Sequence, residues 1–212
     1  MSLAMNPAAS SANKRRSQAE RSGATRAALL DATVACLVSD GYANTTTTKV
    51  AERAGVSRGA HLHHFQTRAA LVAAAVGHLA RRRGEELLAA AAELPQGRER
   101  LGAGLDLLWA SYASPLFQGA LDLWADARTD PELREHLVEV ERMLDRQTQS
   151  VAARIFPDLA GHPNFESLIE LAVATVRGLA LLDTLHPGRG RNREQWPFCR
   201  ERLVETFAEM TG

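Results

Sequence analysis

The chain has 212 residues, of which 45% are hydrophobic and 24% charged, a balance typical of globular rather than disordered proteins. This length buries roughly 70% of the unfolded surface, which excludes a mini-protein that depends on disulfides. Lys and Arg number 25 and so do Asp and Glu, but residues 1–80 hold nine bases against four acids. A basic first part joined to an acidic remainder indicates a polyanion-binding module on a larger body.

The two cysteines, Cys36 and Cys199, lie far apart and favour a reducing cytosol over a disulfide framework, with a single bridge left open. The first residues lack the layout of a signal peptide, and no apolar run approaches the roughly 18 residues that span a bilayer. We therefore expect a cytoplasmic protein. The many arginines and alanines suggest a GC-rich bacterial genome, and residues 1–3 have the character of a cloning scar ahead of Met5.

The amino-terminal part predicts an arm and a first helix. Residues 1–22 are rich in Ser, Ala, Asn and Arg without apolar periodicity, so we expect a mobile basic arm and order from about Gly23. The basic cluster of this arm, Lys14, Arg15 and Arg16, either contacts the grooves or phosphates of DNA or is only solvated, and both interpretations stay open. From Gly23, apolar residues recur at helical spacing until Gly41, which should end the first helix in a left-handed conformation.

Two short helices joined by a tight turn are predicted next. A run of threonines offers N-caps to a helix that carries Val50 inward and ends at Gly55. Ser57 should cap the following helix, in which Leu62 and Phe65 should point inward. This is the layout of a helix-turn-helix, whose second helix lies in the major groove of DNA with its early residues at base edges.

Long helices fill the rest of the chain, with Thr67 capping the first of them and Asp130-Pro131 as a strong start signal. We expect helices over residues 68–94, 99–113, 116–129, 131–156, 165–185 and 193–211. No strand pattern and no internal repeat appears. The predicted fold class is all-α with about nine helices, comprising a three-helix domain over residues 23–70 and a larger C-terminal domain over residues 71–212.

Basic, hydroxyl-bearing and small residues gather around the predicted turn. Arg58 and Lys49 suit phosphate or guanine contacts, the threonines offer hydroxyls, and small side chains after Ser57 let the backbone approach DNA. His61 and His64 at i, i+3 raise a metal alternative, but no third ligand stands at a matching offset, so we expect no metal. The predicted DNA-binding residues are Arg26, Thr46, Thr47, Thr48, Lys49, Ser57, Arg58, Gly59, Ala60, His61, His63, His64 and Arg68.

The segments GYANTT at residues 41–46 and VAERAGVSRGAHLHHF at residues 50–65, followed by Arg68 and Leu71, resemble the DNA-binding domain of the tetracycline-repressor (TetR) family. This resemblance covers about residues 23–72. It implies a homodimeric transcriptional regulator, most often a repressor, with a divergent helical second half that binds a small effector and forms the dimer. The family commonly has an aromatic residue, often tyrosine, where this chain has Leu62, so His63 or His64 would have to replace its phosphate contact.

Aromatic and apolar residues concentrate in the central helices of the second half. A packed core and a cavity that resembles the family's effector pocket explain them equally well. Arg177 stands in an apolar run, where a salt bridge to an internal acid such as Asp106, Asp122 or Asp126 is favoured over an effector carboxylate. The candidate ligand-binding residues are Leu108, Trp109, Tyr112, Phe117, Leu121, Trp124, Met143 and Arg177.

The helix over residues 165–185 is apolar nearly all round, so both of its faces should be covered. The last helix adds Trp196, Phe198, Leu203, Val204, Phe207 and Met210. We expect both helices to pair with their copies in a second subunit as a four-helix bundle, as the resemblance also implies.

Neither a nucleophile-base pair nor paired carboxylates on a strand-loop frame appears, so we expect neither an enzyme nor a cofactor. We expect a homodimeric DNA-binding regulator, with repression as the favoured outcome. It should bind a palindromic operator and be released from it by a small molecule bound in the C-terminal domain. The alternative is a regulator of the same fold without an effector.

Overall fold

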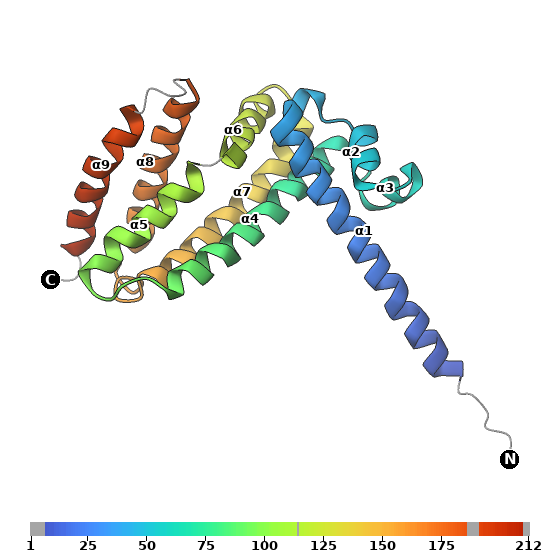
Figure 1. Ribbon diagram of the computed structural model, residues 1–212, viewed down its shortest axis with the longest axis horizontal. Helices are drawn as coiled ribbons and strands as arrows, with labels where there is room; N and C mark the ends of the chain where they lie inside the picture. The colour runs from blue at the N-terminus through green and yellow to red at the C-terminus, as the bar shows by residue number, and fades with distance from the viewer. Residues whose placement is uncertain (1–6, 114, 186–190, 210–212) are drawn as a thin grey trace, which may run out of the picture. The chain divides into compact units, whose positions relative to one another are not determined.

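A computed structural model describes residues 7–113, 115–185 and 191–209 of the chain, and Figure 1 shows these ranges. They form nine α-helices and no strand, which confirms the all-α prediction. The helices are α1 (Pro7–Asn44), α2 (Thr47–Ala54), α3 (Arg58–His64), α4 (Arg68–Ala92), α5 (Arg98–Tyr112), α6 (Pro115–Ala127), α7 (Pro131–Ile155), α8 (Phe165–Leu185) and α9 (Arg191–Ala208). None of the described helices is long and apolar enough to cross a membrane.

The first helix departs from the sequence-based expectation at its start. It begins at Pro7 rather than near Gly23, and residues 1–6 of the expected arm lie outside the described residues. The physical reason is that residues 7–22 contain Ala, Arg, Gln and Glu, which are good helix formers, and extending a helix costs less than nucleating one. Near its other end the helical geometry is interrupted at Gly41, whose φ of 72° lies in the region that favours glycine.

The side chains expected to cap the helices do so. The Thr46 side chain accepts a hydrogen bond from the Lys49 amide, and the Ser57 side chain accepts one from the Ala60 amide. Asp130 does the same for Leu133 at the start of α7. Each cap satisfies one of the amide groups that a helix start leaves without an intrahelical acceptor, which fixes where the helix begins.

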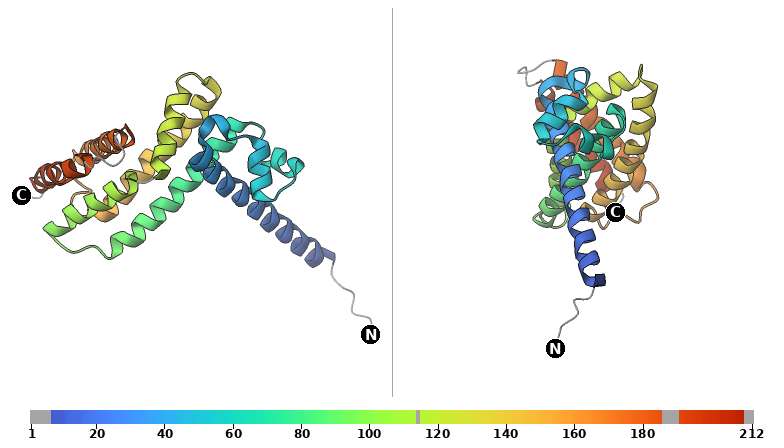
Figure 2. Two further views of the ribbon diagram at one scale, coloured as in Figure 1. Left: turned by 45° about the horizontal axis from the view of Figure 1, so that its top comes forward. Right: turned by 90° about the vertical axis from the view of Figure 1, so that its right-hand side faces the viewer.

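The chain divides into two compact units, Met1–Ala75 and Val76–Gly212. The division therefore falls inside α4, slightly beyond the expected boundary after residue 70. In the first unit α2 and α3 pack against α1, as Figure 2 shows. Its buried core gathers apolar residues from α1, α2 and the start of α4 together with Phe65, and the largest of them are Leu29, Leu30, Val50, Phe65 and Leu71.

The second unit is built from the remainder of α4 and from α5 to α9. Within it α5 contacts both α8 and α9, while α7 lies against α6 and α8. The core includes Leu105, Phe156, Val176 and Phe207, all buried. This packing places aromatic and aliphatic side chains of five helices around one interior, which sets the position of a cavity described below. Cys36 and Cys199 both carry free thiols.

Candidate nucleic-acid interface and internal cavity

The turn between α2 and α3 depends on Gly55. Its φ of 65° and ψ of 29° are left-handed, a conformation that strains residues with a Cβ atom. The Gly55 amide donates to the Glu52 carbonyl, and the Val56 amide donates to the Ala51 carbonyl at 3.0 Å. Val56 then packs against the core. The turn thus ends α2 and presents α3 as a separate short helix.

The outward face of α3 and the start of α2 carry most of the predicted DNA-binding residues. Ser57, Arg58, Gly59 and His63 are exposed, as are Thr46, Thr48 and Lys49, and Thr47 and His64 are partly exposed. The Lys49 ammonium lies 3.1 Å from the Asp40 carboxylate, and their hydrogen bond lowers the pKa of Asp40. The structure therefore brings together a basic and hydroxyl-bearing surface of the kind that binds phosphates.

One predicted contact is corrected. His61 is only 2% exposed, so its side chain lies in the interior of the unit and is not available to contact DNA at the outer face of α3. Leu62, expected to point inward, is instead 52% exposed. Both differences have one cause: the inward stripe of α3 runs through His61 and Phe65, four residues apart, rather than through residues 62 and 65. Leu62 is thus a surface residue of α3 that the sequence pattern missed.

The histidines of α3 have lowered basicity. The pKa of His61 lies below its ordinary value of 6.5, chiefly because burial disfavours the charged ring, with repulsion from His64 as a smaller cause. Burial also lowers the pKa of His64, assisted by repulsion from His63 and Arg26. The Nε2 atom of His61 is buried and has no hydrogen-bond partner among the described residues. At neutral pH these two rings are therefore predominantly neutral.

Two predicted DNA-binding arginines also have partners within the unit. An Arg68 NH group donates to the Tyr42 and Ala43 carbonyls at 3.3 and 3.5 Å, and its guanidinium lies 4.1 Å from the centre of the Tyr42 ring. Arg26 lies 5.4 Å from the centre of the Phe65 ring. These contacts hold the start of α4 to the last turn of α1 and the exposed side of α1 to the end of α3. A DNA contact by either arginine stays a prediction.

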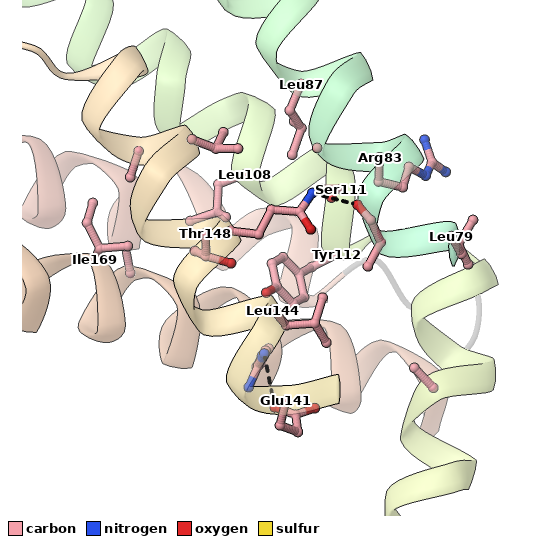
Figure 3. A pocket seen from close by; sticks show the side chains of 18 of the residues that line it. Leu79, Arg83, Leu87, Leu108, Ser111, Tyr112, Glu141, Leu144, Thr148 and Ile169 are labelled. Carbon is pink, nitrogen blue, oxygen red and sulfur yellow. Dashed lines mark hydrogen bonds and ion pairs between the residues drawn. The ribbon is translucent and has the colours of Figure 1, made fainter. Parts of the chain in front are cut away.

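The second unit contains a partly open cavity of about 190 Å³ between α4, α5, α6, α7 and α8. Figure 3 shows Leu79, Leu87, Leu108, Leu144 and Ile169 pointing into it, so its walls are mainly aliphatic. An engineered apolar cavity of roughly 150 Å³ holds benzene, so this space suits a small organic molecule. Of the two expectations for these helices, a packed core and a cavity, the structure contains a cavity between the central helices.

Polar and aromatic groups occupy one corner of the cavity. Arg177 NH2 lies 4.0 Å from the Glu141 Oε2 atom, drawn as a dashed line in Figure 3. The same guanidinium lies 5.5 Å from the centre of the Tyr112 ring and 5.1 Å from that of the Trp124 ring. Arg177 therefore has an internal acidic partner, as expected, but the partner is Glu141 of α7 and not Asp106, Asp122 or Asp126.

Burial raises the pKa of Glu141 above its ordinary value of 4.5. The Arg177 charge and a hydrogen bond with Trp124 oppose this shift, while the Asp145 charge adds to it. Asp106, one of the expected partners of Arg177, instead accepts hydrogen bonds from Trp196 Nε1 and from Arg200 Nε, each at 2.9 Å. The corner thus combines an arginine with a carboxyl group that has a reduced tendency to ionise.

Four of the candidate ligand-binding residues line the cavity: Leu108, Tyr112, Trp124 and Arg177. Three do not, namely Trp109, Leu121 and Met143. Trp109 stacks on Trp196 with ring centres 5.2 Å apart, because α5 turns that side chain toward α9. Met143 faces α4, where its sulfur lies 3.6 Å from an Arg81 NH group. The side chain of Phe117 lies outside the described residues.

Large apolar side chains remain exposed on the last two helices. They are Leu171, Leu181 and Leu182 of α8, each about half exposed, and Phe198 of α9, which is 66% exposed. Trp196, Leu203 and Phe207 are buried inside the unit instead, Val204 packs against its core, and Met210 lies outside the described residues. Among the described residues, no cluster of three or more His, Cys, Asp or Glu could hold a metal ion.

A short exposed helix held by a left-handed glycine turn, on a compact three-helix core, defines a helix-turn-helix DNA-binding protein. The family described as "Bacterial regulatory proteins, tetR family" matches residues 29–75. An uncharacterized HTH-type transcriptional regulator of Mycobacterium tuberculosis is 31% identical over 174 residues, which cover 81% of this chain and 89% of that protein. The chain belongs to the TetR family of transcriptional regulators.

Two further comparisons agree. The HTH-type transcriptional regulator CymR of Pseudomonas putida is 33% identical over 172 residues, which cover 79% of this chain and 83% of CymR. The crystal structure of a TetR-family regulator from Mesorhizobium loti superposes with a TM-score of 0.67 at 18% identity, over 88% of this chain and 96% of that one. This likeness concerns the fold as a whole and includes the helices that surround the cavity.

Proposed function

We propose that the protein is a cytoplasmic repressor that binds a palindromic operator as a homodimer and is released by a small molecule in the second unit. The observation that carries the DNA-binding part is the exposed face of α3, which presents Arg58, Gly59, Leu62 and His63 beside the Lys49 end of α2. Arg58 at the helix start is suited to a guanine or a phosphate, and Leu62 is suited to a thymine methyl group.

The exposed apolar residues of α8 and α9 support a dimer. Burying Leu171, Leu181, Leu182 and Phe198 against a second copy removes apolar surface from water and creates a two-fold axis. Two copies of α3 about 34 Å apart enter successive major grooves of the operator. If each half-site neutralises about four phosphates, the logarithm of the affinity falls with that of the salt concentration with a slope of about −7.

The cavity supports an effector. A regulator without an effector calls for a filled interior, whereas this one holds space of about 190 Å³. A protein of the same fold from Saccharomonospora viridis, with a TM-score of 0.57 and 16% identity, has been crystallised with choline. Helix α4 contributes Leu71 to the core of the first unit and Leu79 and Leu87 to the cavity wall. A ligand that favours a different position of α4 then alters the spacing of the two recognition helices. About 2.7 kcal/mol of coupling suffices for a hundredfold release.

Selection of bound sequences from random double-stranded DNA with the purified full-length protein tests this function. We expect enrichment of a consensus with two-fold symmetry, and light scattering of the complex should show two or more subunits for each DNA molecule. The absence of any enriched sequence would argue against an operator-binding regulator. A consensus without symmetry that binds a single subunit would argue against the homodimer.

A further inference from the structure

The polar corner of the cavity contains an arginine whose hydrogen-bonding capacity is largely unused. The Arg177 Nε atom is buried and has no acceptor among the described residues, and NH2 lies 4.0 Å from Glu141, beyond hydrogen-bond distance. The side chain itself is 30% exposed and lines the cavity. Buried donors in proteins are normally paired, so an arginine that lines a cavity and has an unpaired donor indicates that an acceptor is missing.

The guanidinium is nevertheless held in position. It lies against the Tyr112 and Trp124 rings, with the centres of both rings within about 5.5 Å. Contact with two aromatic faces orients the planar group without using its NH donors in hydrogen bonds. Arg177 thus has a fixed orientation and free donors, which is what a preorganised site for a planar anion requires.

The arrangement of charges in the cavity points to Arg177 as the group that receives a ligand. Its charged lining residues are Arg83, Arg177 and Glu141, and Arg83 NH1 already pairs with Glu86 Oε2 at 3.0 Å, so Arg177 is the cation available to an anion. An ammonium ligand at the two aromatic rings would have to displace Arg177 or lie beside it. Glu141 is also a weakened counter-ion, because burial raises its pKa. An incoming anion at Arg177 therefore competes with a carboxyl group whose ionisation is disfavoured by burial.

We propose that the cavity binds a small monocarboxylate with an apolar body, and that Arg177 receives the carboxylate in place of Glu141. This inference rests on the proposed function in that it takes the cavity as the effector site. Leu79, Leu108, Leu144 and Ile169 then cover the apolar body. Since roughly 150 Å³ accommodates the six carbon atoms of benzene, a cavity of about 190 Å³ accommodates about eight non-hydrogen atoms including the carboxylate.

Thermal melting and calorimetric titration of the full-length protein with matched probes test the proposal. The carboxylates are butanoate, hexanoate, octanoate, cyclohexanecarboxylate and phenylacetate, and each is compared with its primary amide and with an amine of similar size. We expect at least one carboxylate to raise the melting temperature and to bind at least about tenfold more tightly than its amide, because only the anion pairs with Arg177. Amides or amines that bind as tightly as the carboxylates, or carboxylates that all fail to bind, overturn the proposal.

Variants identify the receiving group. Arg177→Met should weaken the bound carboxylate by about tenfold to a hundredfold, and Arg177→Lys, which keeps the charge but loses the planar fork, should weaken it less. Glu141→Gln should strengthen it, because a competing negative charge is removed; a merely structural role of Arg177 would not produce that gain. Arg146→Met removes a charge from the exposed side of α7 and should leave the affinity unchanged. If folded Arg177→Met and Arg177→Lys both keep the wild-type affinity, the assignment is wrong.

Operator binding measured without any probe separates this inference from the proposed function. A protein that selects a symmetric DNA sequence but binds no carboxylate retains its function and refutes the ligand class. A protein that binds a carboxylate through Arg177 but selects no DNA sequence refutes the regulator and leaves the ligand class standing.

Discussion

Arg100 joins the ends of two helices that surround the cavity, and its removal should destabilise the second unit strongly. Its guanidinium donates to the Ala91, Leu94 and Pro95 carbonyls at the end of α4 and to the Arg154 and Ile155 carbonyls at the end of α7. The Arg154 and Ile155 carbonyls belong to the last turn of α7, where a helix leaves carbonyls without an intrahelical partner, and a cation at a helix end also interacts favourably with the helix dipole.

The size of the effect follows from this geometry. The bonds to Ala91, Leu94, Pro95 and Arg154 are long, 3.3 to 3.4 Å, so we count one effective charged hydrogen bond for each helix end. At about 1.5 to 3 kcal/mol each, less what water recovers at the partly exposed carbonyls, Arg100→Met should cost about 3 kcal/mol. For a unit of this size 1 kcal/mol corresponds to roughly 3 to 4 °C, so the melting temperature should fall by about 10 °C.

Differential scanning calorimetry at one fixed protein concentration is the appropriate assay, because subunit association also shifts the melting temperature. Arg100→Lys keeps the charge at one helix end and should lie between wild type and Arg100→Met. Arg146→Met removes an exposed arginine and should change the melting temperature by less than about 2 °C. If Arg100→Met melts within that same margin, the two helix ends do not depend on Arg100 and the reasoning is wrong.

Three further predictions concern the recognition unit and the dimer. Gly55→Val should destabilise the first unit by about 1 to 2 kcal/mol because of the φ of 65° at this position. Gly59→Ala, at the second position of α3, should instead stabilise the unit by up to about 1 kcal/mol. Equal effects of the two changes in chemical denaturation would contradict the role of the turn. The pKa of His61 is lower in the folded protein than in the unfolded chain, so as the pH falls below 6.5 the unfolded chain binds a proton before the folded protein does. The contribution of His61 to the free energy of unfolding is therefore greatest above pH 6.5 and is lost on acidification. His61→Leu should flatten this decline in melting curves from pH 8 to pH 5, and an unchanged slope would exclude His61 as its cause. Phe198→Glu should shift sedimentation toward the monomer, and an unaltered dimer would place the interface elsewhere.

Local chemistry made most of the helix boundaries predictable from the sequence. Side-chain caps at Thr46, Ser57 and Asp130 and the left-handed glycine at Gly55 act within four residues, so their effect can be inferred without the fold. The prediction that α1 begins near Gly23 was wrong, because the absence of apolar periodicity indicates only that a segment has no buried face. It does not prevent helix formation by Ala-rich and Arg-rich sequence.

The details of the sites depended on tertiary packing. The seven residues of α3 are too few for periodicity to fix the inward face, and a rotation by one position exchanged His61 with Leu62. The pairing of Arg177 with Glu141 depends on how α7 and α8 are aligned, and the sequence gives no measure of this alignment. For the same reason Trp109 was expected at the cavity although α9 offers it Trp196 as a stacking partner.

The affinity of Arg58→Ala for a selected operator, compared with its affinity for scrambled DNA and with its melting temperature, tests the central claim most directly. We predict a loss of about 1 to 3 kcal/mol in operator binding, a smaller loss on scrambled DNA and an unchanged melting temperature, because Arg58 is exposed at the start of α3. Arg142→Ala, on the exposed side of α7, should leave all three unchanged. Wild-type operator affinity in folded Arg58→Ala, or a loss of affinity that only follows a loss of stability, would contradict the claim that α3 reads the DNA.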